Sequence, residues 1–116
     1  MLPPQHRLRS TAAFGRTVKK GRKKGSATVV AYTLVDKTSV ASVGGPRVGL
    51  IVSKAVGNAV ARHHTSRLLR HASAEALRSL DIPTGAHIVL RALPASGNAT
   101  YQEIKADVHS CIRRSL

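Results

Sequence analysis

Three segments of the chain have the hydrophobic pattern of β-strands. Residues 27–35 are rich in β-branched side chains, and residues 87–94 form an apolar run that ends at a proline. In residues 47–54, apolar positions alternate with polar residues or glycine, and Ile51 makes the second face partly apolar as well. The segment 36–46 is rich in Ser, Thr, Gly and Pro, so we expect a long connection with room for one further short strand.

Helical periodicity predicts three helices. The longest covers about residues 58–80 and begins after a glycine, with Asn58 as a fair N-cap. A shorter helix over residues 11–20 follows Ser10, another N-cap candidate, and the last, from 101 to about 114, begins at a Thr-x-x-Glu capping box. In the longest helix the apolar arc consists of Ala61, Thr65, Leu68, Leu69, Ala72 and Ala76, and the opposite arc of Arg62, His63, Ser66, Arg67, Arg70 and His71.

The order of these elements defines the expected fold class. Helix, two strands, helix, strand and helix follow one another over 116 residues, without an internal repeat or a second domain. We therefore expect one α+β domain over residues 1–116, with helices packed against a small sheet.

Charge narrows the choice of partner. The chain has 19 Lys and Arg against 5 Asp and Glu, a formal net charge of +14, and neither residues 1–24 nor residues 47–70 contain an acid. A surface charged only for solubility would mix the two signs, so a polyanionic partner is expected, nucleic acid first and an anionic membrane surface second. The run 19–25, with two glycines, is expected to be a loop that contacts phosphate through Lys19, Lys20, Arg22, Lys23 and Lys24.

Several function classes are excluded by what the sequence lacks. It has no apolar run long enough for a transmembrane helix and no signal-peptide pattern, so we expect a cytoplasmic protein. The lone Cys111 can form neither an internal disulfide nor, by itself, a zinc site. A nuclease that uses His63 and His64 would need nearby carboxylates, but no acid lies between Asp36 and Glu75, so we expect no catalytic or metal-ligating set.

Aromatic side chains are few, and the sequence leaves their role open. Phe14, Tyr32 and Tyr101 belong to three different predicted elements. If those elements meet, the rings could form a platform on which unpaired bases stack. Core packing explains them equally well.

The motifs resemble one family over nearly the whole chain. RVGLIVSKAVGNAVARHHTSRLLR (47–70) resembles the signature of the bacterial ribonuclease P protein component. RLRSTAAFGRTVKKG (7–21) resembles its first helix, VVAYTL (29–34) its first strand, HIVLRALPAS (87–96) its last strand and turn, and YQEIKADV (101–108) the start of its last helix. The resemblance implies a mixed four-stranded sheet with three helices, in the order α-β-β-β-α-β-α. It also implies a two-layer sandwich like that of a ribosomal protein, with a left-handed βαβ crossover.

The same resemblance implies a function. Members of the family bind a large catalytic RNA, and together they remove the 5′ leader of precursor tRNA by Mg²⁺-dependent hydrolysis. The RNA carries the chemistry, and the protein alone binds no cofactor. The alternative is a ribosomal-type RNA-binding protein or RNA chaperone without a catalytic partner.

The resemblance also implies two binding surfaces, whose residues are found by matching this sequence to the family's motifs position by position. The surface for the catalytic RNA would comprise Lys54, Asn58, Arg62, His63, His64, Arg67 and Arg70, with His63 and His64 in place of the family's Asn and second Arg. A cleft for the precursor leader would comprise Phe14, Val18 and Tyr32, with Val18 where an aromatic residue is usual. Residues 1–8 are expected to be flexible and to become ordered on RNA binding.

Overall fold

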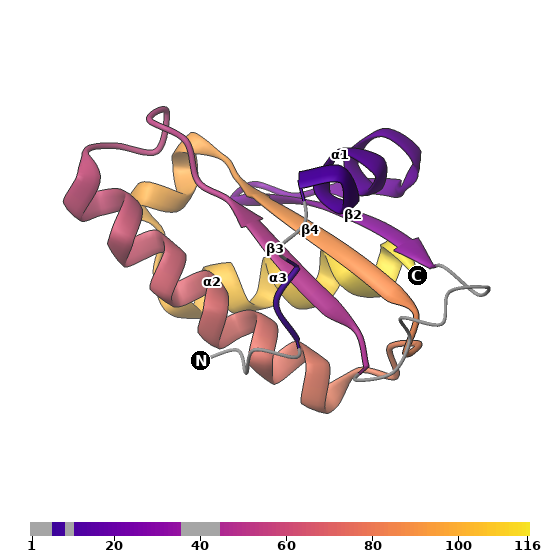
Figure 1. Cartoon of the computed structure of the whole chain (residues 1–116). Coiled ribbons are helices and arrows are strands. Elements are labelled where there is room, and N and C mark those ends of the chain that lie inside the picture. Colours follow the sequence, from indigo (N-terminus) through magenta and orange to yellow (C-terminus); the bar gives the residue numbers. More distant parts are fainter. Residues whose placement is uncertain (1–5, 9–10, 36–44) are drawn as a thin grey trace.

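In the computed structural model, which describes residues 6–8, 11–35 and 45–116, a four-stranded mixed sheet carries three helices (Figure 1). The strands are β1 (Arg22–Gly25), β2 (Val29–Val35), β3 (Arg47–Ile51) and β4 (Ala86–Ala92), in the order β1-β2-β4-β3. β4 is antiparallel to β2 and parallel to β3. The predicted α+β class and element order are confirmed.

The described residues also form the three α-helices and a 3₁₀ turn after β4. They are α1 (Thr11–Lys20), α2 (Ala59–Ser79), η3 (Pro94–Asn98) and α3 (Tyr101–Ser115). The predicted helix boundaries agree to within one or two residues, and the capping box of α3 is present in both directions. α2 is the crossover between the parallel strands β3 and β4, while its left-handed sense stays an expectation from the resemblance.

The fourth strand lies in a segment that was expected to be a loop. Residues 22–25 pair with β2 as an edge strand, in the register Arg22↔Thr33 to Gly25↔Val30. All four residues are exposed, so no alternation of apolar residues marks the strand in the sequence. Lysines on an exposed edge strand also discourage pairing with other chains. The loop prediction is therefore wrong, and the segment 36–44, where a further strand was expected, lies outside the described residues.

The two faces of the sheet have separate hydrophobic clusters. One cluster joins α2 and α3 to the face that contains Val29, Ala31, Ile88 and Leu90, and this is the two-layer sandwich. A smaller cluster lies on the opposite face, where α1 packs over part of the sheet (Figure 1). Its buried members are Leu8, Val30, Tyr32 and Val89, and Ala13, Phe14, Ile51 and Leu93 pack against them. Successive side chains of β2 and β4 therefore point alternately into the two clusters, one on each face of the sheet.

The N-terminal segment runs beside β3. Arg7 forms a parallel bridge with Val48, and the N–H of Leu8 donates to the carbonyl oxygen of Val48 at 3.0 Å. The side chain of Leu8 is buried. These contacts place residues 6–8 against β3. The expected flexibility of residues 1–8 stays a prediction, and residues 1–5 lie outside the described part.

Candidate nucleic-acid interface

The α1 face of the sheet carries a row of side chains set by strand register. Lys23 lies opposite Tyr32, Tyr32 opposite Val89, and Val89 opposite Gly49. These four positions cross the whole sheet from β1 to β3. At Gly49 the ring of Phe14 from α1 lies directly against β3, because a Cβ there would collide with this ring. The glycine therefore makes room for Phe14 on the sheet.

A second row beside it contributes a cation that the sequence did not single out. Val30, Arg91 and Ile51 are neighbours in register, on the same face as Tyr32. Arg91 is exposed, whereas Val30 and Val89 on the same face are buried. Arg91 and Lys23 therefore give this apolar face two cations on two different strands. Arg91 could have been identified from the sequence as a surface cation, because it is the one charged residue in the apolar run 87–94.

The three aromatic residues do not form one platform. Phe14 and Tyr32 belong to the cluster on the α1 face, but Tyr101 lies at the start of α3 and packs against the other cluster. Tyr32 is only 5% exposed, and Lys23 Nζ lies 6.0 Å from its ring centroid. Phe14 is half-buried, so it is the aromatic side chain of this face that a base can reach. Of the other predicted leader contacts, Val18 is 38% exposed on α1.

The basic half of α2 borders a hollow of about 300 Å³. Val52, Ala59, Arg62, His63, Ser66 and Arg70 line it. Arg62 Nε is enclosed and has no hydrogen-bond partner among the described residues. An enclosed N–H without an acceptor is costly, so the guanidinium group favours an anion such as a phosphate oxygen. Three of the predicted RNA contacts, Arg62, His63 and Arg70, are thus brought together, while Lys54, His64 and Arg67 are exposed outside this hollow.

The start of α2 depends on a Gly-Asn pair. Gly57 has φ of +153°, and a Cβ there would lie 2.8 Å from the Cβ of Ala61. Asn58 Oδ1 accepts a hydrogen bond from the N–H of Ala61 at 2.9 Å, which is an N-cap. The predicted cap is confirmed, and this hydrogen bond gives Asn58 a structural role in addition to any contact with RNA.

The basic segment 19–24 is divided between two faces. Lys19 and Lys20 end α1, where cations are favourable for the helix dipole. Lys23 is on the α1 face beside Tyr32, whereas Arg22 Nη1 donates to the carbonyl oxygen of Leu116 at 3.2 Å, at the end of α3. The five cations therefore do not form one phosphate-binding loop.

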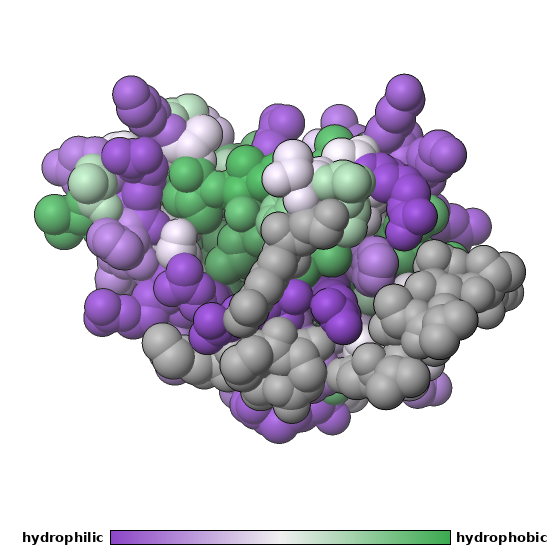
Figure 2. All heavy atoms as spheres, in the orientation of Figure 1, coloured by the Kyte–Doolittle hydropathy of each residue, from purple (hydrophilic) through white to green (hydrophobic). Residues whose placement is uncertain are grey.

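The space-filling view joins the sheet face to the basic helix. Figure 2 shows hydrophobic surface between α1 and the N-terminal end of α2, above the end of β3, with hydrophilic side chains around it. Ile51 and Val52 are half-buried at the end of β3, and Val52 lines the hollow beside Arg62. The apolar face and the basic face are thus adjacent parts of one surface.

The described residues show neither a cluster of metal ligands nor a membrane-spanning helix. Among them, no group of three or more His, Cys, Asp or Glu is placed to hold a metal ion. No described helix is both long enough and apolar enough to cross a membrane.

A basic α+β domain with a cation-lined apolar sheet face beside a basic helix belongs to the class of RNA-binding proteins. Residues 2–115 match the family described as Ribonuclease P. The chain is 53% identical, over all of its length and 98% of the relative, to the ribonuclease P protein component of Corynebacterium jeikeium. It is 46% identical to that of Mycolicibacterium vanbaalenii, over 98% of this chain and 92% of the relative. The RNase P protein of Staphylococcus aureus superimposes with a TM-score of 0.77 at 25% identity, and the match covers 94% of each chain. The chain belongs to the ribonuclease P protein component family.

Proposed function

We propose that this chain binds the catalytic RNA of ribonuclease P and the 5′ leader of precursor tRNA, and promotes Mg²⁺-dependent endonucleolytic removal of the leader. The observation that carries the proposal is the adjacency of two surfaces of different chemistry. One is the hollow on α2 with the enclosed Arg62, and the other is the sheet face with Phe14. A single protein surface can thus contact a folded RNA and an unpaired strand at the same time.

The leader would lie extended across the sheet face. Phe14 offers an aromatic surface, and Val18 and Ile51 offer apolar contact. Lys23 and Arg91 lie on two different strands of this face and would neutralise phosphates. Tyr32 is buried in the cluster beneath this face, so it would support the surface on which the leader lies. Contacts of this kind favour precursor over mature tRNA, which lacks a leader.

The catalytic RNA would contact α2. Arg62, His63 and Arg70 would bind phosphates at the hollow, and the exposed Lys54, His64 and Arg67 would extend the contact along the helix. In this proposal the RNA supplies the catalytic groups and holds the Mg²⁺. The protein supplies fixed positive charge, which replaces some of the screening by metal ions and lowers the Mg²⁺ concentration that cleavage needs.

A binding experiment with leaders of different length tests this function. The dissociation constants of precursor tRNAs with leaders of increasing length, and of mature tRNA, would be measured for the complex of chain and catalytic RNA. We expect affinity to rise with leader length, because more of the strand lies on the sheet face, and then to level off. Equal affinity for precursor and mature tRNA would instead favour a ribosomal-type RNA-binding protein. If about six phosphates are contacted, the log–log salt slope should be roughly −4 to −5.

A further inference from the structure

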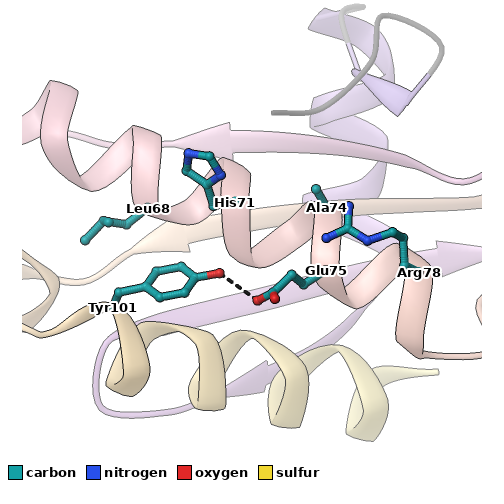
Figure 3. A pocket seen from close by; sticks show the side chains of 6 residues that line it. All are labelled: Leu68, His71, Ala74, Glu75, Arg78 and Tyr101. Carbon is teal, nitrogen blue, oxygen red and sulfur yellow. Dashed lines mark hydrogen bonds between the residues drawn. The ribbon is translucent and has the colours of Figure 1, made fainter.

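A groove between α2 and α3 lies apart from both surfaces described above. Its first part is a hollow of about 290 Å³ lined by Leu68, His71, Ala74, Glu75, Arg78 and Tyr101 (Figure 3). Its second part is a hollow of about 510 Å³ lined by Glu75, Arg78, Ser79, Leu80, Lys105, His109 and Arg113. The two parts share Glu75 and Arg78, so they are adjacent along the same helix pair, and together they are called the α2–α3 groove.

The one acid of this groove is already engaged. Glu75 Oε2 accepts a hydrogen bond from the Tyr101 hydroxyl at 2.7 Å and lies 3.4 Å from Lys105 Nζ. Figure 3 shows the Glu75 carboxylate turned toward Tyr101, while the Arg78 guanidinium extends along α2 over Ala74. These contacts hold the carboxylate on the α3 side, and they lower the pKa of Glu75, chiefly through the hydrogen bond from Tyr101.

Two arginines of the groove, Arg78 and Arg113, form no ion pair among the described residues. Arg78 still acts on the nearby Glu75 carboxylate, whose pKa it helps to lower after the hydrogen bond from Tyr101 and the charge of Lys105. His109 lies between the two helices, and its Nε2 is enclosed without a hydrogen-bond partner in the part of the chain that the structure describes. Burial lowers the pKa of His109, Lys105 and Arg113 lower it further, and Glu75 opposes them. The lining of the groove thus places three cations, Arg78, Lys105 and Arg113, around the single carboxylate of Glu75.

We propose that the α2–α3 groove is a second phosphate-binding site, which takes backbone phosphates of RNA on Arg78 and Arg113, with Lys105 beside them. RNA is favoured as the ligand because the cations of α2 continue along one side of the helix. Arg67 and Arg78 are both exposed and lie about three turns apart on one side of α2, so the basic surface extends from the region of the α2 hollow toward this groove. This inference rests on the proposed function, since the RNA would be either the catalytic RNA or the precursor tRNA that binds to the assembled complex.

Two adjacent arginines on α3 provide the test and its matched control. Arg113 lines the groove, whereas Arg114 Nη2 donates to the carbonyl oxygen of Gly25 at 2.9 Å, outside it. Arg113→Gln and Arg114→Gln remove the same charge from the same turn of the same helix. The affinity of each full-length variant for the catalytic RNA would be measured over a range of salt concentrations, and then the affinity of each assembled complex for precursor tRNA.

We expect Arg113→Gln to reduce the magnitude of the salt slope by about 1, and Arg78→Gln/Arg113→Gln by about 2. Arg114→Gln should leave the slope close to that of the unmodified protein. A change in the first binding step identifies the catalytic RNA as the source of the phosphate, and a change only in the second identifies precursor tRNA. Equal slopes for Arg113→Gln and Arg114→Gln in both steps would overturn the inference while leaving the proposed function intact. A chain that binds no catalytic RNA would overturn both.

A spectroscopic measurement gives a second readout. Titration of His109 by NMR in the full chain, with and without inorganic phosphate, follows the charge that enters the groove. A bound phosphate should raise the pKa of His109, because it offsets Lys105 and Arg113. The rise should be smaller in Arg78→Gln/Arg113→Gln than in Arg114→Gln. An identical response in these variants would contradict a phosphate site in the groove.

Discussion

At the scale of single residues, Arg62 differs from the other cations of α2 in how its side chain is held. Its Nε is enclosed beside a hollow and has no partner among the described residues, whereas Arg67 on the same helix is exposed. A fixed donor without an acceptor loses less entropy when a phosphate binds than a mobile exposed side chain does. The basic arc of the helix is visible in the sequence, but this difference within it is not, because it depends on the tertiary packing that brings Val52 of the β3 end beside Arg62.

Replacing Arg62 should therefore cost more RNA affinity than replacing Arg67. We expect Arg62→Gln to weaken binding of the catalytic RNA by about 1.5–3 kcal/mol, the range for a hydrogen bond to a charged group. Arg67→Gln should cost about 1 kcal/mol or less, as an exposed ion pair does. Fluorescence anisotropy at one fixed salt concentration measures both. Equal losses would show that the enclosed position of Arg62 has no bearing on RNA binding.

Phe14 is the accessible aromatic side chain of the sheet face, so its replacement should affect precursor tRNA selectively. Phe14→Leu keeps apolar bulk over Gly49 but removes the ring. If one base of the leader stacks on this ring, precursor affinity should fall by about 1–3 kcal/mol. Mature tRNA should bind unchanged. Tyr32→Phe is the matched control, since the Tyr32 ring is enclosed, and it should have a smaller effect. Parallel losses for precursor and mature tRNA would argue against a leader contact.

At the scale of elements, the helices and the three apolar strands could be predicted because each has a local signal. α1, α2 and α3 begin and end where periodicity, Asn58 and the capping box place them. β1 could not be predicted in this way. Its four exposed residues, Arg22–Gly25, form a strand because β2 offers a partner, and pairing with a distant strand leaves no pattern in so short a segment.

The start of α2 can be tested through its cap. Asn58→Ala removes the acceptor for the Ala61 N–H and should lower the free energy of unfolding by about 1 kcal/mol. Asn58→Ser retains a capping oxygen and should remain close to the unmodified protein. Urea unfolding measures both. If Asn58→Ser keeps its stability but loses RNA affinity, the Asn58 amide also contacts RNA, and if it keeps both, capping is its main role. Equal unfolding free energies for the Ala and Ser variants would contradict the cap.

The contact between α2 and α3 should depend on pH. Burial, followed by the hydrogen bond that its hydroxyl donates to Glu75, raises the pKa of Tyr101 to about 12, and the same hydrogen bond lowers the pKa of Glu75. A carboxylate with a lowered pKa stabilises the fold fully above its unfolded pKa, and this contribution is lost as the pH falls through its folded value. Tyr101→Phe should therefore reduce the melting temperature at pH 7 and have a smaller effect at acid pH. Thermal unfolding at a series of pH values measures this difference. A constant difference across that range would show that the Glu75 carboxylate is not involved.

At the scale of the whole molecule, the two faces of the sheet differ in what they contact. One face packs against α2 and α3 to form the larger core, and the other holds α1 and leaves apolar side chains beside Arg91 and Lys23. The basic segment 19–25 was predicted to be one phosphate-contacting loop, and the structure divides its cations between the two sides of β1. Composition could indicate a polyanionic partner, but the side on which each cation lies depends on strand register and on the position of α1.

The central claim is that the chain acts as a subunit whose RNA partner carries the chemistry. The most direct measurement is 5′ processing of a precursor tRNA at low Mg²⁺ concentration, with the catalytic RNA alone, the chain alone, and the two together. We expect cleavage at the mature 5′ end only in the mixture, because the cations of the chain replace part of the screening by Mg²⁺. Cleavage by the chain alone, or no gain when the chain is added to the RNA, would contradict the account.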